Sequence, residues 1–367
     1  MVEDQKNNSR ATDDAMARMF LQNYWYVVAT SEELTQKLLA RVVLRHSVVL
    51  YRTPDGTPVA MEDLCPHRSL PLSMGELAGD RVRCGYHGLE FDPSGKCAHI
   101  PGQTHIAAGW KVKTYPVVEK WRWIWIWVGD ARLADPATIP NMYWNDDPRW
   151  TFTGGHFEIK CGYQLLVDNL LDLSHESFVH RSTIGNDAVA ETPADTSVEG
   201  HTVRIFRLMQ NCPPPPLYTK LKSFPGNINR SQNIIFTPPS NIVIESKSTA
   251  VDRDGTDALE YRVLNAITPA TARACHHFWS VPRNFAPTEE VTKLFHRGSV
   301  TAFSEDIVVL EAQQSAIDAR GGEVQWKNFN VDTGNVAARR IVSSLLDAQA
   351  GSASGHPVEA GKRRSRS

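Results

Sequence analysis

Two short loops, each with one cysteine and one histidine, constrain this chain more than any other feature of its sequence. The first loop contains Cys65 and His67, and the second, which begins after sixteen further residues, contains Cys84 and His87. Six cysteines in 367 residues do not resemble a disulfide framework, and in a reducing compartment such a pattern favours metal binding. The loops therefore predict a centre with two thiolate and two imidazole ligands.

The order of the ligands indicates which centre this is. In a Rieske 2Fe-2S cluster, two cysteines hold one iron and two histidines hold the other. A Cys2His2 zinc site is the alternative, but zinc fingers usually group Cys with Cys and His with His. Gly85 and Gly88 allow the backbone to turn closely around the cluster. The remaining cysteines lack such partners and are expected to be buried thiols: Cys97, Cys161, Cys212 and Cys275.

A second candidate metal site lies in the stretch 168–180, DNLLDLSHESFVH. Asp172 and His175 are three residues apart, about 300° around a helix, so they would share a face. His180 lies about 140° away from that face, so a regular helix cannot aim both imidazoles at one point. The helix therefore either ends within 176–178 or contains a wide π-type turn there. Imidazole suits iron, copper, zinc and nickel, so the pair does not name the metal.

The hydrophobic pattern divides the chain into parts. Residues 1–22 read as a leader, 23–133 as a compact all-β unit, 134–350 as an α+β unit that starts with a Pro/Asp/Asn-rich linker, and 351–367 as a disordered tail. Asp55-Gly56 predicts a hairpin turn, and the aromatic run WRWIWIWV predicts a strand that buries its indoles. Long strands are expected at 201–210, 233–236, 241–249, 260–268 and 274–281.

The C-terminal half ends in helices. One helix is expected over 288–319, with a break near Gly298, and a shorter one over 335–349. The prolines at 213–216 predict a loop, which could lie over an active site. On the long helix Asp306 shares a side with Phe303 and Leu310, where a carboxylate is costly unless it binds a metal or is paired. Glu305 is the competing acidic residue.

These motifs resemble those of the oxygenase components of Rieske non-haem iron oxygenases, specifically the vanillate and dicamba O-demethylase group. The resemblance covers nearly all of the folded chain, from NYWYVVAT through CPHR, CGYHGLEFD and DNLLDLSHESFVH to FSEDIVVLEAQQ. It implies a Rieske domain followed by a helix-grip catalytic domain, an antiparallel sheet with helices. It also implies a mononuclear Fe²⁺ held by His175, His180 and Asp306.

The same resemblance assigns roles around the iron. Asp172 is expected to accept the ring hydrogen bond of His175 and to bridge to a Rieske histidine, His87, of a neighbouring subunit. That arrangement implies a ring of identical subunits, a homotrimer. Asn169 matches a nearby polar residue of the family.

Composition excludes other partners. Lys and Arg number 39 against 41 Asp and Glu, so nothing points to nucleic acid or an anionic membrane. No signal peptide and no apolar run of membrane length are seen, so a soluble cytoplasmic protein is expected. The chain also lacks a convincing dinucleotide-binding motif and a plant-type ferredoxin cysteine run. Electrons from NAD(P)H are therefore expected through a separate reductase or ferredoxin.

The resemblance implies oxidative dealkylation of a small aromatic substrate with O2, and O-demethylation of a methoxybenzoate such as vanillate is favoured. The alternatives are N-dealkylation of an anilide or urea herbicide and hydroxylation of a ring or methyl group, with one or both oxygens inserted. An electron carrier using only the cluster would not need some two hundred further residues. The resemblance to the dicamba O-demethylase group implies four residues near the substrate: Asn241, Asn265, His276 and Arg297. Arg297 is expected either to pair with a carboxylate of the substrate or to lie on the surface of its helix.

Overall fold

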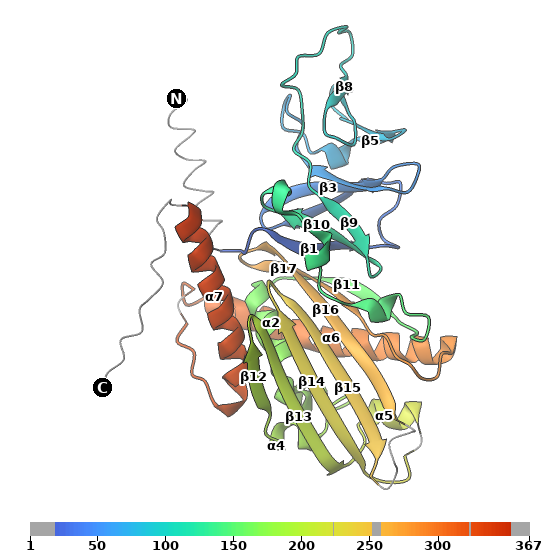
Figure 1. The fold of residues 1–367 in the computed structure, drawn as a ribbon, viewed down its shortest axis with the longest axis vertical. Coiled ribbons are helices and arrows are strands. Elements are labelled where there is room, and N and C mark those ends of the chain that lie inside the picture. Colours follow the sequence, from blue (N-terminus) through green and yellow to red (C-terminus); the bar gives the residue numbers. More distant parts are fainter. Residues whose placement is uncertain (1–18, 223, 252–257, 323, 354–367) are drawn as a thin grey trace, which may run out of the picture.

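The computed structural model describes residues 19–222, 224–251, 258–322 and 324–353. A smaller β unit stands on one end of a larger unit built from a sheet and helices (Figure 1). Most of the predicted leader and tail, 1–18 and 354–367, lies outside the described residues. The predicted leader, 1–22, overlaps the folded part, because Phe20 and Leu21 are buried in the hydrophobic cores.

The smaller unit contains three antiparallel sheets, ordered β2-β3-β4, β1-β10-β9 and β5-β6-β7-β8. The predicted turn at Asp55-Gly56 joins β3 to β4, with Gly56 at φ 90°. The predicted burial of Trp123, Trp125 and Trp127 in β10 is confirmed. The strands are β1 Tyr24–Thr30, β2 Leu39–Val43, β3 His46–Arg52, β4 Pro58–Glu62, β5 Glu76–Ala78, β6 Arg81–Arg83, β7 Glu90–Phe91, β8 Cys97–His99, β9 Val117–Lys120 and β10 Trp123–Val128.

The larger unit is organised around one antiparallel sheet of seven strands, in the order β11-β17-β16-β15-β14-β13-β12. Alternate residues of β13, β14 and β15 are buried, because one face of the sheet is covered by helices. We call this covered side the inner face. The strands are β11 Gly154–Ile159, β12 Asp195–Glu199, β13 Thr202–Cys212, β14 Ile228–Thr237, β15 Asn241–Ala250, β16 Leu259–Thr271 and β17 Ala274–Ser280.

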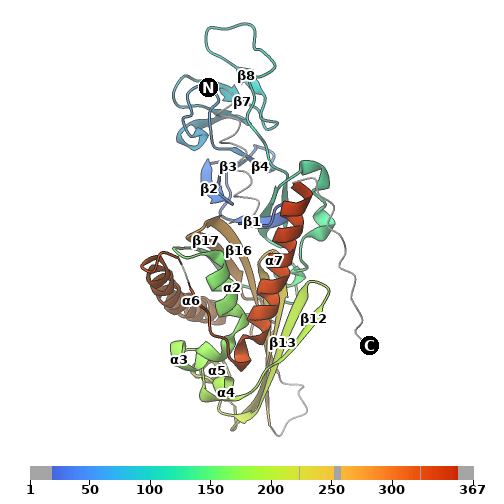
Figure 2. The ribbon, with the colours of Figure 1, turned by 90° about the vertical axis from the view of Figure 1, so that its left-hand side faces the viewer.

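The helices α2, α6 and α7 pack against the inner face (Figure 2). The helix α6 runs without interruption through Gly298, so the predicted break is wrong. A Cβ added at Gly298 would lie 3.4 Å from the nearest side-chain atom of Leu217, an ordinary contact distance. Within the described ranges, no helix is long and apolar enough to cross a membrane. The helices are α2 Tyr163–Leu171, α3 Glu176–Val179, α4 Asp187–Glu191, α5 Pro216–Leu221, α6 Glu289–Asp318 and α7 Thr333–Ala353.

The two units share a packed interface. The backbone N–H groups of Leu44 and Arg45 donate to the carbonyls of Pro269 and Ala270, both at 2.8 Å. A common apolar cluster joins the tryptophans of β10 to Leu264, Ala266 and Phe278 of the large sheet. The linker after residue 133 also enters this cluster through buried Ile139 and Met142. The linker is therefore part of the packed interface rather than a free tether.

Candidate metal centres and active-site cavity

The two Cys/His loops have the same backbone shape. In each, the N–H of the cysteine donates to the carbonyl five residues later, at 2.9 Å for Cys65 and 2.8 Å for Cys84. The N–H four residues after each cysteine donates back to its carbonyl, from Ser69 at 2.9 Å and from Gly88 at 3.1 Å. Both of these residues have positive φ, 58° and 71°. The chain thus presents its two cysteines from two matching turns.

The side chains of these loops fit a Rieske cluster. Cys65 and Cys84 are buried, whereas His67 is half-buried and His87 is exposed. The ring centroids of the two histidines lie 4.5 Å apart. Burial, with a contribution from the nearby Cys84 thiol, raises the pKa of Cys65, so a thiolate there needs a metal to stabilise it. Nδ1 of His67 is buried without a hydrogen-bond partner among the described residues, as expected for a ligand atom.

The second site begins where α2 ends. Asp172 leaves the helix with φ −117° and ψ 96°, a 3-10 turn spans Leu173–His175, and the short helix α3 follows. The chain therefore breaks earlier than predicted, and Asp172 and His175 do not share a helical face. The cause is the Asp172 carboxylate, which accepts hydrogen bonds from the N–H and hydroxyl of Ser174 at 2.9 and 3.0 Å and so caps the new turn.

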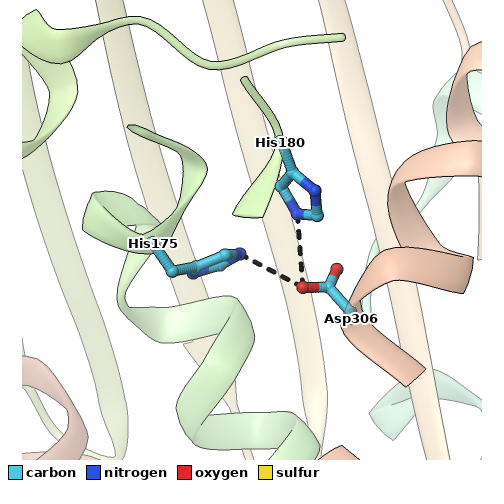
Figure 3. A group of neighbouring side chains, drawn as sticks. All are labelled: His175, His180 and Asp306. Carbon is cyan, nitrogen blue, oxygen red and sulfur yellow. Dashed lines mark ion pairs between the residues drawn. The ribbon is translucent and has the colours of Figure 1, made fainter. Parts of the chain in front are cut away.

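This break brings three side chains together. One ligand atom from each of His175, His180 and Asp306 lies within 4.8 Å of the others. The Nε2 atoms of His175 and His180 lie 3.4 and 3.2 Å from the same Oδ1 of Asp306, which projects from α6 (Figure 3). Two imidazoles and one carboxylate on one side of a point match the facial arrangement that leaves open positions on non-haem iron. We call these residues the triad.

The other ring nitrogens orient the two histidines. Nδ1 of His175 lies 2.5 Å from the backbone carbonyl of Asp172, and Nδ1 of His180 lies 2.8 Å from Oε2 of Glu305. Each bond leaves Nε2 for a metal. The predicted partner of His175 is thus corrected: the Asp172 carbonyl accepts the bond, since its carboxylate is used to cap the turn. Glu305 orients a ligand and is not itself among the three converging residues. Asn169 donates to Asp306 Oδ1 at 3.0 Å.

Electrostatics within the triad favour proton retention when no metal is bound. Burial disfavours a charged imidazole, but the Asp306 carboxylate overcomes this effect and raises the pKa of His180 to about 8. It also raises the pKa of His175, and both histidines hold the pKa of Asp306 well below its usual range against the opposing effect of burial. A metal ion would displace these protons and take their place.

Comparison with known proteins agrees with this geometry. Residues 24–116 match the Rieske [2Fe-2S] domain, and residues 159–348 match the vanillate O-demethylase oxygenase C-terminal domain. The vanillate O-demethylase oxygenase subunit of Pseudomonas sp. (strain HR199 / DSM 7063) is 39% identical over 344 residues, 90% of this chain and 96% of the relative. The chain belongs to the Rieske non-haem iron oxygenases.

Other members of the family are similarly close to this Rieske oxygenase. The dicamba O-demethylase oxygenase component of Stenotrophomonas maltophilia is 36% identical over 90% of this chain and 99% of the relative. The crystal structure of dicamba monooxygenase bound to dicamba superposes with a TM-score of 0.85, at 33% identity, over 91% of this chain and 99% of that one. The predicted order of domains, an all-β Rieske domain and then an antiparallel sheet with helices, is confirmed.

A cavity of the Rieske oxygenase opens beside the triad. Its floor is the inner face of the sheet, where two cross-strand rows lie next to each other. The polar row consists of Gln232, Ser246 and Tyr261, paired in register across β14, β15 and β16. The apolar residues of the floor are Ile244, Val263 and Val281, and the roof contains Leu217, Phe295, Ala302 and Phe303. The predicted loop at 213–216 continues into α5, which supplies Leu217.

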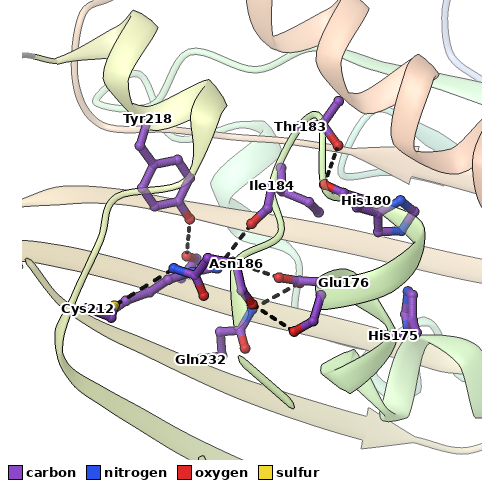
Figure 4. A network of polar contacts seen from close by, with 12 residues as sticks. His175, Glu176, His180, Thr183, Ile184, Asn186, Cys212, Tyr218 and Gln232 are labelled. Carbon is purple, nitrogen blue, oxygen red and sulfur yellow. Dashed lines mark hydrogen bonds and ion pairs between the residues drawn. The ribbon is translucent and has the colours of Figure 1, made fainter. Parts of the chain in front are cut away.

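A buried network supports the polar row (Figure 4). Arg230 Nη2 and Glu176 Oε2 form an ion pair of 2.9 Å, and Nε2 of Gln232 donates to Oε1 of Glu176 at 2.9 Å. Tyr218 Oη lies 3.0 Å from Ser246 Oγ and 2.7 Å from Tyr261 Oη. Because Glu176 follows His175 directly in the chain, this network also fixes the backbone that carries the first histidine.

The four residues predicted to contact substrate do not line this cavity. Strand alternation excludes Asn241 and His276, because their neighbours on β15 and β17 point to the inner face instead. His276 donates through Nε2 to the carbonyl of Val42, in the Rieske domain, at 3.0 Å. Asn265 is on the inner face, but its amide bonds within the sheet and to His277. Arg297 is exposed on α6 and therefore cannot anchor a buried carboxylate.

The sequence analysis missed Arg230 and Gln232, although the pattern of strand β14 could have indicated them. In β14 the buried positions alternate from Ile228 to Phe236, and Arg230 and Gln232 are the polar members of that set. Polar side chains on the apolar face of a strand need buried partners, which makes them candidates for a site. What the sequence could not supply was the partner, Glu176, from a distant segment.

Proposed function

We propose that this chain is the oxygenase component of a multicomponent monooxygenase that removes the methyl group of a methoxylated aromatic compound as formaldehyde. The observation that carries the proposal is the cavity, whose largely apolar floor and roof would hold an aromatic ring directly beside the triad. Relatives named vanillate and dicamba O-demethylase support a methoxyarene as the substrate, and vanillate, a methoxybenzoate, is the first candidate.

Two metal groups belong to this proposal. Cys65, Cys84, His67 and His87 would hold a 2Fe-2S cluster, and the triad would hold Fe²⁺. When bound, the cluster supplies single electrons and the mononuclear iron supplies reductive activation of O2. The chain's own contribution is positioning: Glu305 and the Asp172 carbonyl fix the two imidazoles, Asn169 holds Asp306, and the apolar walls exclude water from the ring.

The electrons are proposed to come from NAD(P)H through a separate reductase or ferredoxin. Relatives described as an oxygenase component or as the iron-sulfur subunit of a monooxygenase system support such a partner. The cluster loops adjoin the sheet β5–β8, at the end of the Rieske domain farthest from the catalytic sheet (Figure 1). A partner protein can therefore approach this end of the Rieske domain.

The same separation supports a homotrimer. Because the cluster loops and the triad lie toward different ends of one chain (Figure 1), we propose that each triad is paired with the cluster of a neighbouring subunit. Asp172 is half-buried next to the triad and is the residue assigned to the bridge toward the neighbour's His87. Analytical ultracentrifugation is expected to show the mass of three chains, and a stable monomer with full activity would contradict the assignment.

Product analysis tests the reaction. Purified protein loaded anaerobically with Fe²⁺ is supplied with a flavin/ferredoxin reductase, NADH, O2 and a panel of methoxybenzoates, methoxyphenols and N-alkyl anilides. We expect one formaldehyde per demethylated methoxyarene. N-dealkylation is the second candidate, because none of the described residues lining the cavity is a lysine or arginine and one relative is a chloroacetanilide N-alkylformylase. Turnover of the anilides alone would favour it, and ring hydroxylation without formaldehyde would contradict both.

A further inference from the structure

The orientation of the Gln232 amide is fixed by its partner. The carboxylate of Glu176 forms an ion pair with Arg230, and both side chains are almost completely buried. A carboxylate only accepts hydrogen bonds, and therefore the group that Gln232 presents to it at 2.9 Å must be the NH2. The carbonyl oxygen, Oε1, is consequently left on the other side of the amide.

This oxygen is an unused acceptor in the wall of the cavity. Gln232 is 2% exposed and lines the cavity, and its Oε1 has no hydrogen-bond partner among the described residues. A buried carbonyl oxygen without a partner is unfavourable, so such a group needs a ligand or an ordered water. Because the amide cannot rotate without placing its oxygen against Glu176, only a hydrogen-bond donor can satisfy it.

The rest of the polar row adds hydroxyl groups but no charge. Hydrogen bonds join the hydroxyls of Tyr218, Ser246 and Tyr261, and none of the three side chains carries a charge. The nearest arginine of the network, Arg230, is neutralised by Glu176. The cavity therefore distinguishes ligands by hydrogen bonding along one edge and by apolar contact elsewhere.

We propose that Gln232 is a specificity-determining residue, whose Oε1 accepts a hydrogen bond from a phenolic hydroxyl on the ring of the methoxylated substrate. The inference rests on the proposed demethylation and narrows its substrate class to hydroxylated methoxyarenes. The ring lies over Ile244, Val263 and Val281, and its hydroxyl reaches the neighbouring polar row. A ring without the hydroxyl would displace water from Oε1 and leave that oxygen unpaired.

The test compares two substrates that differ only in the hydroxyl, 4-hydroxy-3-methoxybenzoate and 3-methoxybenzoate. In the complete enzyme, kcat/KM for formaldehyde release and anaerobic affinity by calorimetry are both expected to favour the phenol by about tenfold or more. In Gln232→Met, which has a similar volume but no acceptor, the phenol loses this advantage. Asn233→Ala, which removes an amide from the opposite face of β14, should keep it.

The ratio of kcat/KM for the two substrates distinguishes recognition of the hydroxyl by Gln232 from a purely structural role of this residue. If Gln232 only stabilised Glu176, Gln232→Met would weaken both substrates equally and leave the ratio unchanged, which would overturn the proposal. Equal treatment of the two substrates by the unmodified enzyme would also overturn it, and this measurement does not require the variant to fold. Absence of formaldehyde from every methoxyarene would instead refute the proposed function, whereas calorimetry of the two benzoates would still test the hydroxyl contact.

Discussion

At the scale of single residues, the site depends on which nitrogen of each histidine is free. The two histidines use different kinds of acceptor, a backbone carbonyl for His175 and the Glu305 carboxylate for His180. Glu305 was an alternative ligand in the sequence, because adjacent acidic residues on a helix cannot be ranked by composition. The structure separates their positions: Asp306 is buried at the triad, and Glu305 lies behind His180.

Removing the Glu305 carboxylate should weaken metal binding without affecting the cluster. Glu305→Ala leaves the His180 ring without its acceptor, and loss of such a partner lowers metal affinity by roughly 10- to 100-fold. Glu305→Gln retains an acceptor and should recover most of the affinity. Iron content at a fixed concentration of free Fe²⁺ measures the effect, and Glu290→Ala in the first turn of α6 is the control. Unchanged iron affinity in Glu305→Ala would show that His180 needs no such support.

At the scale of elements, the sequence specified the long strands and the existence of a break between the two histidines. It did not specify where the break falls, because capping by Asp172 competes with continuation of the helix and depends on Ser174 two residues later. The sequence also did not show which face of the sheet each strand residue points to. The strand around His276 was predicted correctly. However, an error of one residue in its alternation moves a side chain from the face that lines the cavity to the face that contacts the Rieske domain. Asn241 and His276 were misplaced for this reason.

The segment after His180 is held by a close backbone contact at Gly185. A Cβ at this position would lie 1.9 Å from the carbonyl oxygen of Glu176. Gly185→Ala should therefore displace the turn that carries His180 and reduce both iron content and turnover at least tenfold, with the visible spectrum of the cluster intact. Gly226→Ala, where no atom lies within 4 Å of the added carbon, should be silent. Full activity of Gly185→Ala would mean that this turn tolerates displacement.

At the scale of the whole molecule, the Rieske and catalytic units are joined by a polar chain as well as by apolar packing. His156 Nε2 donates to His276 Nδ1 at 3.1 Å, and His276 in turn donates to the carbonyl of Val42. Burial, with smaller contributions from His276 and Arg41, lowers the pKa of His156 to about 3. The sequence predicted two domains, but it did not show that they share a packed contact containing neutral histidines.

This contact predicts a loss of stability in acid. The folded pKa of His156, about 3, lies below its ordinary value of about 6.5, so the unfolded chain takes up the proton first as the pH falls. The contribution is complete above about pH 6.5 and declines toward pH 3, by at most about 1.4 kcal/mol per pH unit. Urea unfolding at pH 7.5 and 5.0 should show a smaller decrease in His156→Gln than in the unmodified protein. Parallel decreases would exclude His156 as the source.

The central claim is that catalysis occurs at a metal centre separate from the Rieske cluster. The most direct measurement is iron content, visible spectrum and formaldehyde release of His175→Ala beside the unmodified protein. The unmodified chain should contain about three irons, two in the cluster and one at the triad. The variant should contain about two, keep the cluster spectrum and release no formaldehyde. Formaldehyde release that persisted in His175→Ala would contradict the account.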